Sequence, residues 1–133
     1  GGKVLVNAMQ SADAQRYLGG NYEFMGVAVR SAEIPARQAE MAALVRALQG
    51  ALGAVQSLPV GELVAALPPE MITGADLGEM RDILAKYRAS LYPTSVRIDL
   101  AAAGRVAQSL TVAGLLPPGA KLDGLYDTAV AGG

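Results

Sequence analysis

The spacing of apolar residues differs between the first 30 residues and the rest of the chain. Two short apolar runs, residues 3–9 and 22–29, contain β-branched side chains, which is typical of strands buried on both faces of a parallel sheet. Between them, Ser11 is placed to cap a short helix that Gly19 and Gly20 end. The pattern predicts a strand, helix, strand unit with a right-handed parallel crossover.

After this unit the apolar residues recur at the spacing of one helix face, which predicts four helices and no further strand. Thr73 is expected to cap the third helix and Asp99 the fourth, while Pro68 and Pro69 end the second. The Gly-rich tail is expected to be irregular. The predicted helices cover residues 36–56, 59–63, 75–90 and 99–113.

The predicted fold class is therefore α/β and helix-rich, a partial lobe with a short parallel β-α-β unit followed by four helices. Two parallel strands do not make a stable sheet by themselves. A second copy of the chain could complete the sheet and give a homo-oligomer, or the missing strands could belong to the earlier part of a longer polypeptide. The second interpretation is favoured, because the first strand starts near the beginning of the sequence without a local partner.

Composition narrows the classes of function. The chain is 52% hydrophobic and 17% charged, which indicates a globular protein. Its net charge is −1 and its 11 basic residues are scattered, so we expect no nucleic-acid partner. The longest apolar helical stretch, residues 41–55, is interrupted by Arg46 and Gln49. It falls short of the roughly 20 apolar residues that span a bilayer.

The sequence contains no His and no Cys, which removes the commonest general base, the thiolate nucleophile and the usual transition-metal ligands. A carboxylate, Lys or Tyr site would remain, but no nucleophile, phosphate-binding or dinucleotide-binding motif is present. We therefore expect a protein that is not an enzyme, with no cofactor and no metal site.

Several segments, taken in order, resemble the nitrate, sulfonate and taurine class of solute-binding proteins of ABC importers, a type II periplasmic binding protein family. The resemblance covers nearly all of the chain and depends on the order of weak matches. The family's polypeptide is about twice as long, and its first half supplies much of the pocket. The matching segments are residues 3–9, 11–18, 19–24, 27–30, 38–56, the Leu-Pro-Pro-Glu turn at 67–70, and the tail at 121–127.

The resemblance implies that residues 1–20 belong to the second lobe of such a receptor, and that residues 21–133 hold the crossing strand and the C-terminal helices of the first lobe. It also implies a small anionic or heteroaromatic solute, such as nitrate, a sulfonate, taurine or a pyrimidine. The partners would be that solute and the permease subunits of an ABC transporter. The location would be periplasmic or extracytoplasmic, with any membrane anchor upstream of this chain.

By the same resemblance, Asn21, Tyr22 and Phe24 are candidate ligand-binding residues, because this segment passes between the lobes beside the cleft. Tyr offers a ring face and a hydroxyl, and Asn an amide donor. The structural alternative is a turn followed by core residues of a strand. Asn7 is a fourth candidate at the end of the first apolar run, where a hydrogen bond to a neighbouring loop is the alternative.

Three further points stay open. Arg30 could hold an anionic solute or could meet solvent, and Tyr92 could line a cleft or pack beneath a turn. The alternative function is a non-enzymatic helical scaffold or self-associating interaction protein, in which the amphipathic helices form a bundle.

Overall fold

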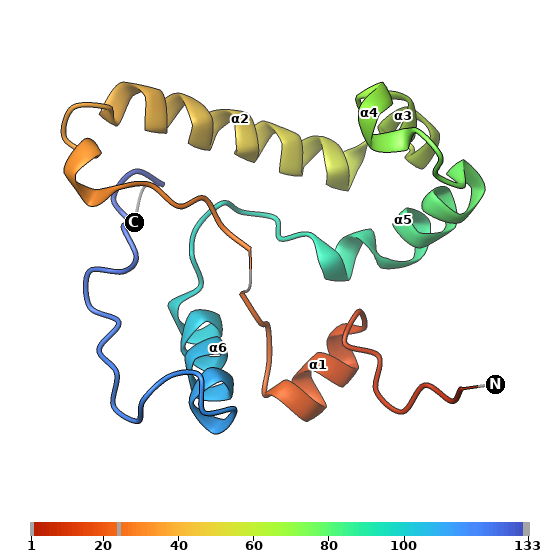
Figure 1. Cartoon of the computed structure of the whole chain (residues 1–133). Coiled ribbons are helices and arrows are strands. Elements are labelled where there is room, and N and C mark those ends of the chain that lie inside the picture. The colour runs from red at the N-terminus through yellow and green to blue at the C-terminus, as the bar shows by residue number, and fades with distance from the viewer. Residues whose placement is uncertain (1, 24, 132–133) are drawn as a thin grey trace. The chain divides into compact units, whose positions relative to one another are not determined.

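A computed structural model describes residues 2–23 and 25–131 of the chain, and Figure 1 shows its ribbon. The described residues are 53% helical. In chain order the elements are α1 Ser11–Leu18, the 3-10 helix η1 Ser31–Glu33, α2 Gln38–Ser57, α3 Val60–Ala65, α4 Pro69–Ile72, α5 Leu77–Leu91 and α6 Leu100–Val112.

The predicted α/β fold class is wrong. The described residues contain no strand and no sheet, and so no β-α-β unit. A strand becomes stable only when the N–H and C=O groups of a neighbour pair with it along its length. Residues 3–7 and 25–30 instead run as loops without regular structure. The assignment of residues 1–20 and 21–133 to two lobes stays a prediction.

The three long helices predicted from apolar spacing are confirmed, with ends that differ by at most two residues. The predicted cap of α6 is also confirmed, because Asp99 Oδ1 accepts hydrogen bonds from the N–H groups of Ala101 at 2.9 Å and Ala102 at 3.0 Å. These bonds satisfy backbone donors that have no partner within the helix. The repeated apolar spacing was therefore sufficient to locate these helices.

Three details of the predicted helix ends were wrong. Gln10, not Ser11, is the N-cap residue of α1, and its side chain makes no capping hydrogen bond. Asp76, not Thr73, caps α5, since its Oδ1 accepts from Gly78 N at 2.8 Å. The Thr73 hydroxyl donates to the Pro69 carbonyl at 2.7 Å instead. Pro69 was expected to end a helix but lies at the start of α4, where a proline's missing N–H costs nothing.

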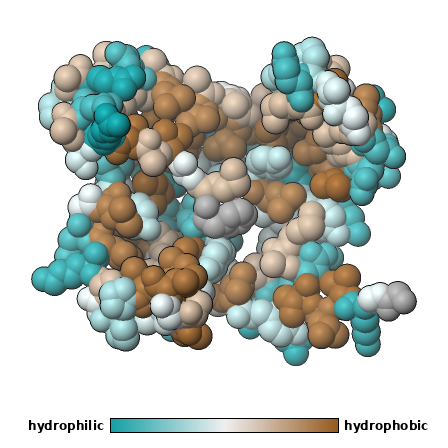
Figure 2. Space-filling model, viewed as in Figure 1, coloured by the Kyte–Doolittle hydropathy of each residue, from teal (hydrophilic) through white to brown (hydrophobic). Residues whose placement is uncertain are grey.

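The chain divides into two compact units. We call residues 46–96 the inserted unit, and residues 1–45 together with 97–133 the flanking unit. The buried hydrophobic residues of the described ranges are Val64 in the inserted unit and Ala102 and Ala103 in the flanking unit. Many other apolar side chains are exposed, and brown residues are spread over the face shown in Figure 2.

The inserted unit is held by the packing of α3 against α5 and by side chains that bind backbone groups. The Gln49 side chain donates to the Thr94 carbonyl at 3.1 Å and accepts from the Val96 N–H at 3.2 Å. Two further bonds join distant segments, from Gln56 to the Tyr92 carbonyl at 3.0 Å and from Arg88 to the Leu58 carbonyl at 2.7 Å.

Candidate functional site

The segment that carries the predicted ligand-binding residues is a glycine turn at the end of α1. Gly19 has φ 78° and Gly20 has φ 138°, and both values favour glycine over residues with a side chain. Gly20 is buried, Asn21 is exposed and Tyr22 is half-buried. We call residues 19–22 the Asn21 turn. The Phe24 candidate lies outside the described residues.

Arg105 of α6 fixes this turn. Its Nε donates to the Asn21 carbonyl at 2.7 Å, and its guanidinium carbon lies 3.0 Å from the place where a Cβ on Gly20 would be. A Cβ at position 20 would therefore be in tight contact with the guanidinium group, which would have to shift slightly. The backbone of Asn21, which directly precedes Tyr22, is therefore hydrogen-bonded to a side chain of α6 that lies 84 positions further along the sequence.

Arg105 and Arg30 differ in their exposure to solvent and in their ion pairs. Arg105 is half-buried, and the salt bridges of the described residues do not involve it. In the described residues its side chain hydrogen-bonds through Nε to the Asn21 carbonyl. Because a guanidinium has five N–H groups, the donors on Nη1 and Nη2 are left over. The Arg30 side chain is 88% exposed and lies 3.5 Å from a Glu33 carboxylate oxygen.

Asn7 is engaged in the turn before α1. Its side-chain oxygen accepts from the Met9 N–H at 3.1 Å, and its own N–H donates to Asp13 Oδ2 at 2.9 Å. The second of these bonds connects the backbone before α1 to Asp13 in the first turn of that helix. An acidic side chain is favourable at this position, because the start of a helix carries a partial positive charge. The described contacts of Asn7 are therefore those of a local turn.

A concave region lies wholly in the inserted unit, and we call it the acidic groove. Its volume is about 500 Å³. Apolar lining residues come from the end of α2, from α3 and from the segment through α4: Val55, Leu63, Leu67, Met71 and Ala75. Met80, Ile83 and Leu84 of α5 and Tyr92 also line the groove.

The charged residues that line the acidic groove are Asp76 and Glu79, both at the start of α5. Asp76 Oδ1 already accepts the N–H groups of Gly78 and Glu79. No salt bridge of the described residues involves either carboxylate. The groove thus combines a large apolar surface with two carboxylates that form no ion pair with the described part of the chain.

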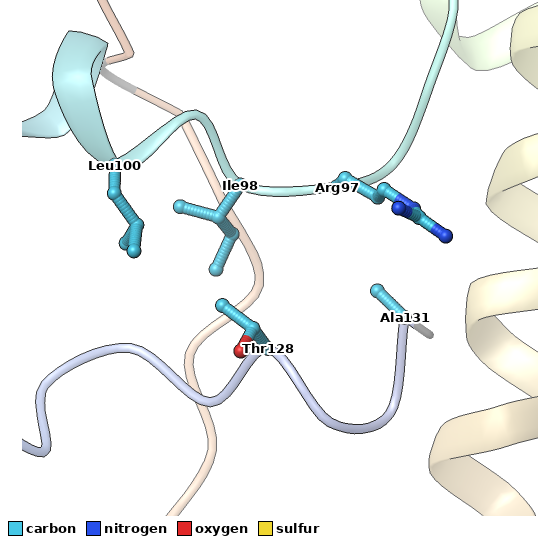
Figure 3. Close-up of a pocket in the computed structure, with 5 residues that line it drawn as sticks. All are labelled: Arg97, Ile98, Leu100, Thr128 and Ala131. Carbon is cyan, nitrogen blue, oxygen red and sulfur yellow. The ribbon is translucent and has the colours of Figure 1, made fainter. Parts of the chain in front are cut away.

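A smaller cavity of about 260 Å³ lies in the flanking unit, and Figure 3 shows its lining. Ile98 and Leu100 come from the segment that enters α6, and Thr128 and Ala131 come from the tail. The Arg97 guanidinium extends away from Ile98 and Leu100 (Figure 3). The remaining surface has a single hydroxyl among apolar groups, which gives it little chemistry for recognising a ligand.

One ion-pair network lies between η1 and the start of α2. Arg37 donates to Glu40 Oε2 at 2.7 and 2.9 Å and to Glu33 Oε2 at 3.1 Å. These hydrogen bonds, with the Glu40 bond the largest cause, raise the pKa of the Arg37 guanidinium above its ordinary value. The network is exposed to solvent, so its contribution to stability is small. Its contacts are local to the start of α2.

In the described ranges, acidic residues do not gather in a group of three or more that could hold a metal ion. None of the helices in those ranges is both long and apolar enough to cross a membrane. Comparison of the chain with protein-family models, curated proteins and solved structures gave no match.

Sequence reasoning named Asn21 and Tyr22 but missed Arg105, the residue that holds their turn. One signal was available, because Arg105 is the one charged residue in the sequence of α6. A charged group in a helix of otherwise uncharged residues often has a specific partner. It also missed the acidic groove, although Tyr92 was named as a residue that could line a cleft.

Proposed function

We propose that the chain is part of the solute-binding receptor of an ABC importer, and that its solute is a small oxyanion such as a sulfonate or nitrate. The observation that carries the choice of an anion is the state of Arg105 beside the Asn21 turn. Arg105 is half-buried as a residue, its Nε is held by the Asn21 carbonyl, and its guanidinium is not paired with a carboxylate in the described residues.

The chemistry follows from which nitrogen is used. Nε of Arg105 is occupied by the Asn21 carbonyl, so the end of the guanidinium formed by Nη1 and Nη2 remains for a ligand. That end can bind two oxygens of one planar or tetrahedral oxyanion at the same time. Because the guanidinium is already oriented, less side-chain entropy is lost on binding than for a free surface arginine.

Titration of the ¹⁵N-labelled chain with methanesulfonate and with nitrate tests the binding site. We expect saturable shifts of the Arg105 Nε–H signal and of the Asn21 amide. Arg105→Gln removes the charge and should abolish both responses. Arg30→Gln is the matched control, because it removes an exposed arginine that already pairs with Glu33. Equal shifts at all arginines, or binding that survives Arg105→Gln, would contradict the site.

Uptake measurements in cells test the importer role separately. Deletion of the gene should abolish high-affinity uptake of the anion that binds in the titration. Restoring the wild-type gene should restore uptake, whereas a gene carrying Arg105→Gln should not. Unchanged uptake in the deletion strain would contradict the receptor role even if the titration succeeds.

The alternative function, a self-associating helical scaffold, is favoured by one observation. Val4, Leu5 and Met25 are 77%, 80% and 83% exposed, and apolar surface of this kind promotes association between proteins. Light scattering across a range of protein concentrations distinguishes the two. A scaffold should be an oligomer of defined size at all of them, and Leu5→Asp should dissociate it.

A further inference from the structure

The acidic groove is a surface with no partner in the described residues. Met71, Ile83 and Tyr92 line it, and they are 65%, 39% and 39% exposed. Its volume of about 500 Å³ falls within the roughly 300 to 1,000 Å³ typical of small-molecule sites. Two of its lining residues are methionines, whose flexible side chains adapt to ligands of different shape.

The charges of the groove select the kind of ligand. A helix start normally attracts anions, but the start of α5 already holds a carboxylate, since Asp76 Oδ1 accepts from Gly78 N and Glu79 N. The Glu79 carboxylate adds a second negative charge, and the described residues that line the groove include no Lys or Arg. The surface therefore disfavours fatty-acid and sulfonate head groups and favours a positive one.

We propose that the acidic groove binds an apolar organic cation, with the hydrocarbon part against the apolar lining residues and the ammonium group at Asp76 and Glu79. The ammonium can donate to Asp76 Oδ2, because Oδ1 is the atom that caps α5, and to either oxygen of Glu79. This site is in the inserted unit and does not depend on the anion site or on the importer role.

Three ligands with the same eight-carbon chain separate charge from hydrophobic burial: n-octylammonium, 1-octanol and octanoate. Binding is followed by the ¹³C-methyl signals of Met71 and Met80, with the other methionines as internal references. We expect n-octylammonium to bind about 5 to 10 times more tightly than octanol, because two exposed carboxylates each contribute a few-fold. Octanoate should bind more weakly than octanol.

Charge-neutral variants locate the effect. Glu79→Gln and Asp76→Asn should each lower the affinity for n-octylammonium about 2- to 4-fold and leave octanol binding unchanged. Asn keeps the side-chain oxygen that caps α5, so the fold is preserved. Glu62→Gln and Asp99→Asn are the controls, since they remove a carboxylate from α3 and from the cap of α6, neither of which lines the groove.

Salt provides a further check. Sodium chloride at 1 M should bring n-octylammonium and octanol to nearly equal affinity, since it shortens the Debye length to about 3 Å. The proposal is overturned if octanoate binds as tightly as n-octylammonium, if the control variants weaken binding as much as Glu79→Gln, or if none of the ligands shifts the Met71 and Met80 signals.

Discussion

The inserted unit and the flanking unit differ in the number and the sequence separation of the side-chain hydrogen bonds that join distant segments within each unit. In the inserted unit, glutamine and arginine side chains bind backbone groups between 30 and 47 positions away. In the flanking unit, the Arg105 to Asn21 bond joins segments 84 positions apart. The entropy of closing a loop rises by only about 0.6 kcal/mol per doubling of its length. The number of cross-links therefore matters more than their separation.

Because of this difference, the stability of the flanking unit depends on few residues. Its buried hydrophobic residues are two alanines, Ala102 and Ala103, whose small side chains bury little area. Its first 30 residues carry Val4, Leu5 and Met25 as highly exposed apolar side chains. The inserted unit spreads its cross-links over several helices. We expect the two units to respond separately to substitutions.

The largest effect is expected for Val64→Asp, which would place a charge at a residue that is 2% exposed. An unpaired buried charge costs about 3 to 5 kcal/mol, which should unfold the inserted unit. Hydrogen exchange would show loss of protection in α3 and α5 and retained protection in α6. Val112→Asp is the control, because Val112 is 85% exposed. Simultaneous loss of protection in α6 would mean that the units do not fold independently.

A pair of glycine substitutions should have opposite signs in the two units. Gly20→Ala should destabilise the flanking unit by about 2 kcal/mol, mainly through backbone strain at positive φ, with a tight contact to the Arg105 guanidinium in addition. Gly50→Ala lies inside α2 with no atom near the added Cβ, so it should stabilise the inserted unit by about 0.5 to 1 kcal/mol. Chemical denaturation measures both, and equal signs would contradict the structure.

A smaller loss is expected for Gln49→Ala in the inserted unit. The substitution removes the bonds to Thr94 and Val96, and exposed hydrogen bonds each contribute about 0.5 to 1 kcal/mol. Faster exchange of the Val96 amide is the direct measurement. Gln49→Glu keeps the acceptor for that amide and should show an intermediate rate. An unchanged exchange rate of the Val96 amide in both variants would show that the Gln49 side chain does not bind this amide.

The smallest effect is expected for Glu40→Gln, which weakens the exposed network around Arg37. Because the pKa of Arg37 is raised, the protonated form is the stabilised one at neutral pH and is lost only in strongly alkaline solution. Thermal melts should therefore show no contribution from Arg37 to pH dependence between about pH 6 and 9. A difference between wild type and variant that persists in 1 M salt would contradict an exposed ion pair.

The helices were predictable because their signals are local. In α2 the apolar residues Met41, Leu44 and Leu48 repeat on one face, and a helix forms from contacts within a few residues. The short helix α4 was missed because a Pro-Pro pair can end one helix or begin the next. The predicted strands were wrong because residues 4–6 have an apolar pattern that suits a strand, but pairing depends on a neighbour that the pattern does not specify.

The candidate site was predictable only in part. The glycine turn and Asn21 were visible in the sequence, because adjacent glycines mark a helix end. Arg105 could not be assigned to this turn, since a contact across 84 positions leaves no local periodicity. The charge of the acidic groove depends on Asp76 and Glu79 lying beside apolar residues from three other segments, which also requires the folded chain.

The long separation between Asn21 and Arg105 also sets an order of events during protein synthesis. A ribosome adds about 5 to 20 residues per second, so Arg105 is made about 4 to 17 s after Asn21. All of residues 46–96 are made in this interval. The last residue of the inserted unit, Val96, is made before Arg105, so this unit has its whole sequence while α1 and its glycine turn still lack the Arg105 hydrogen bond.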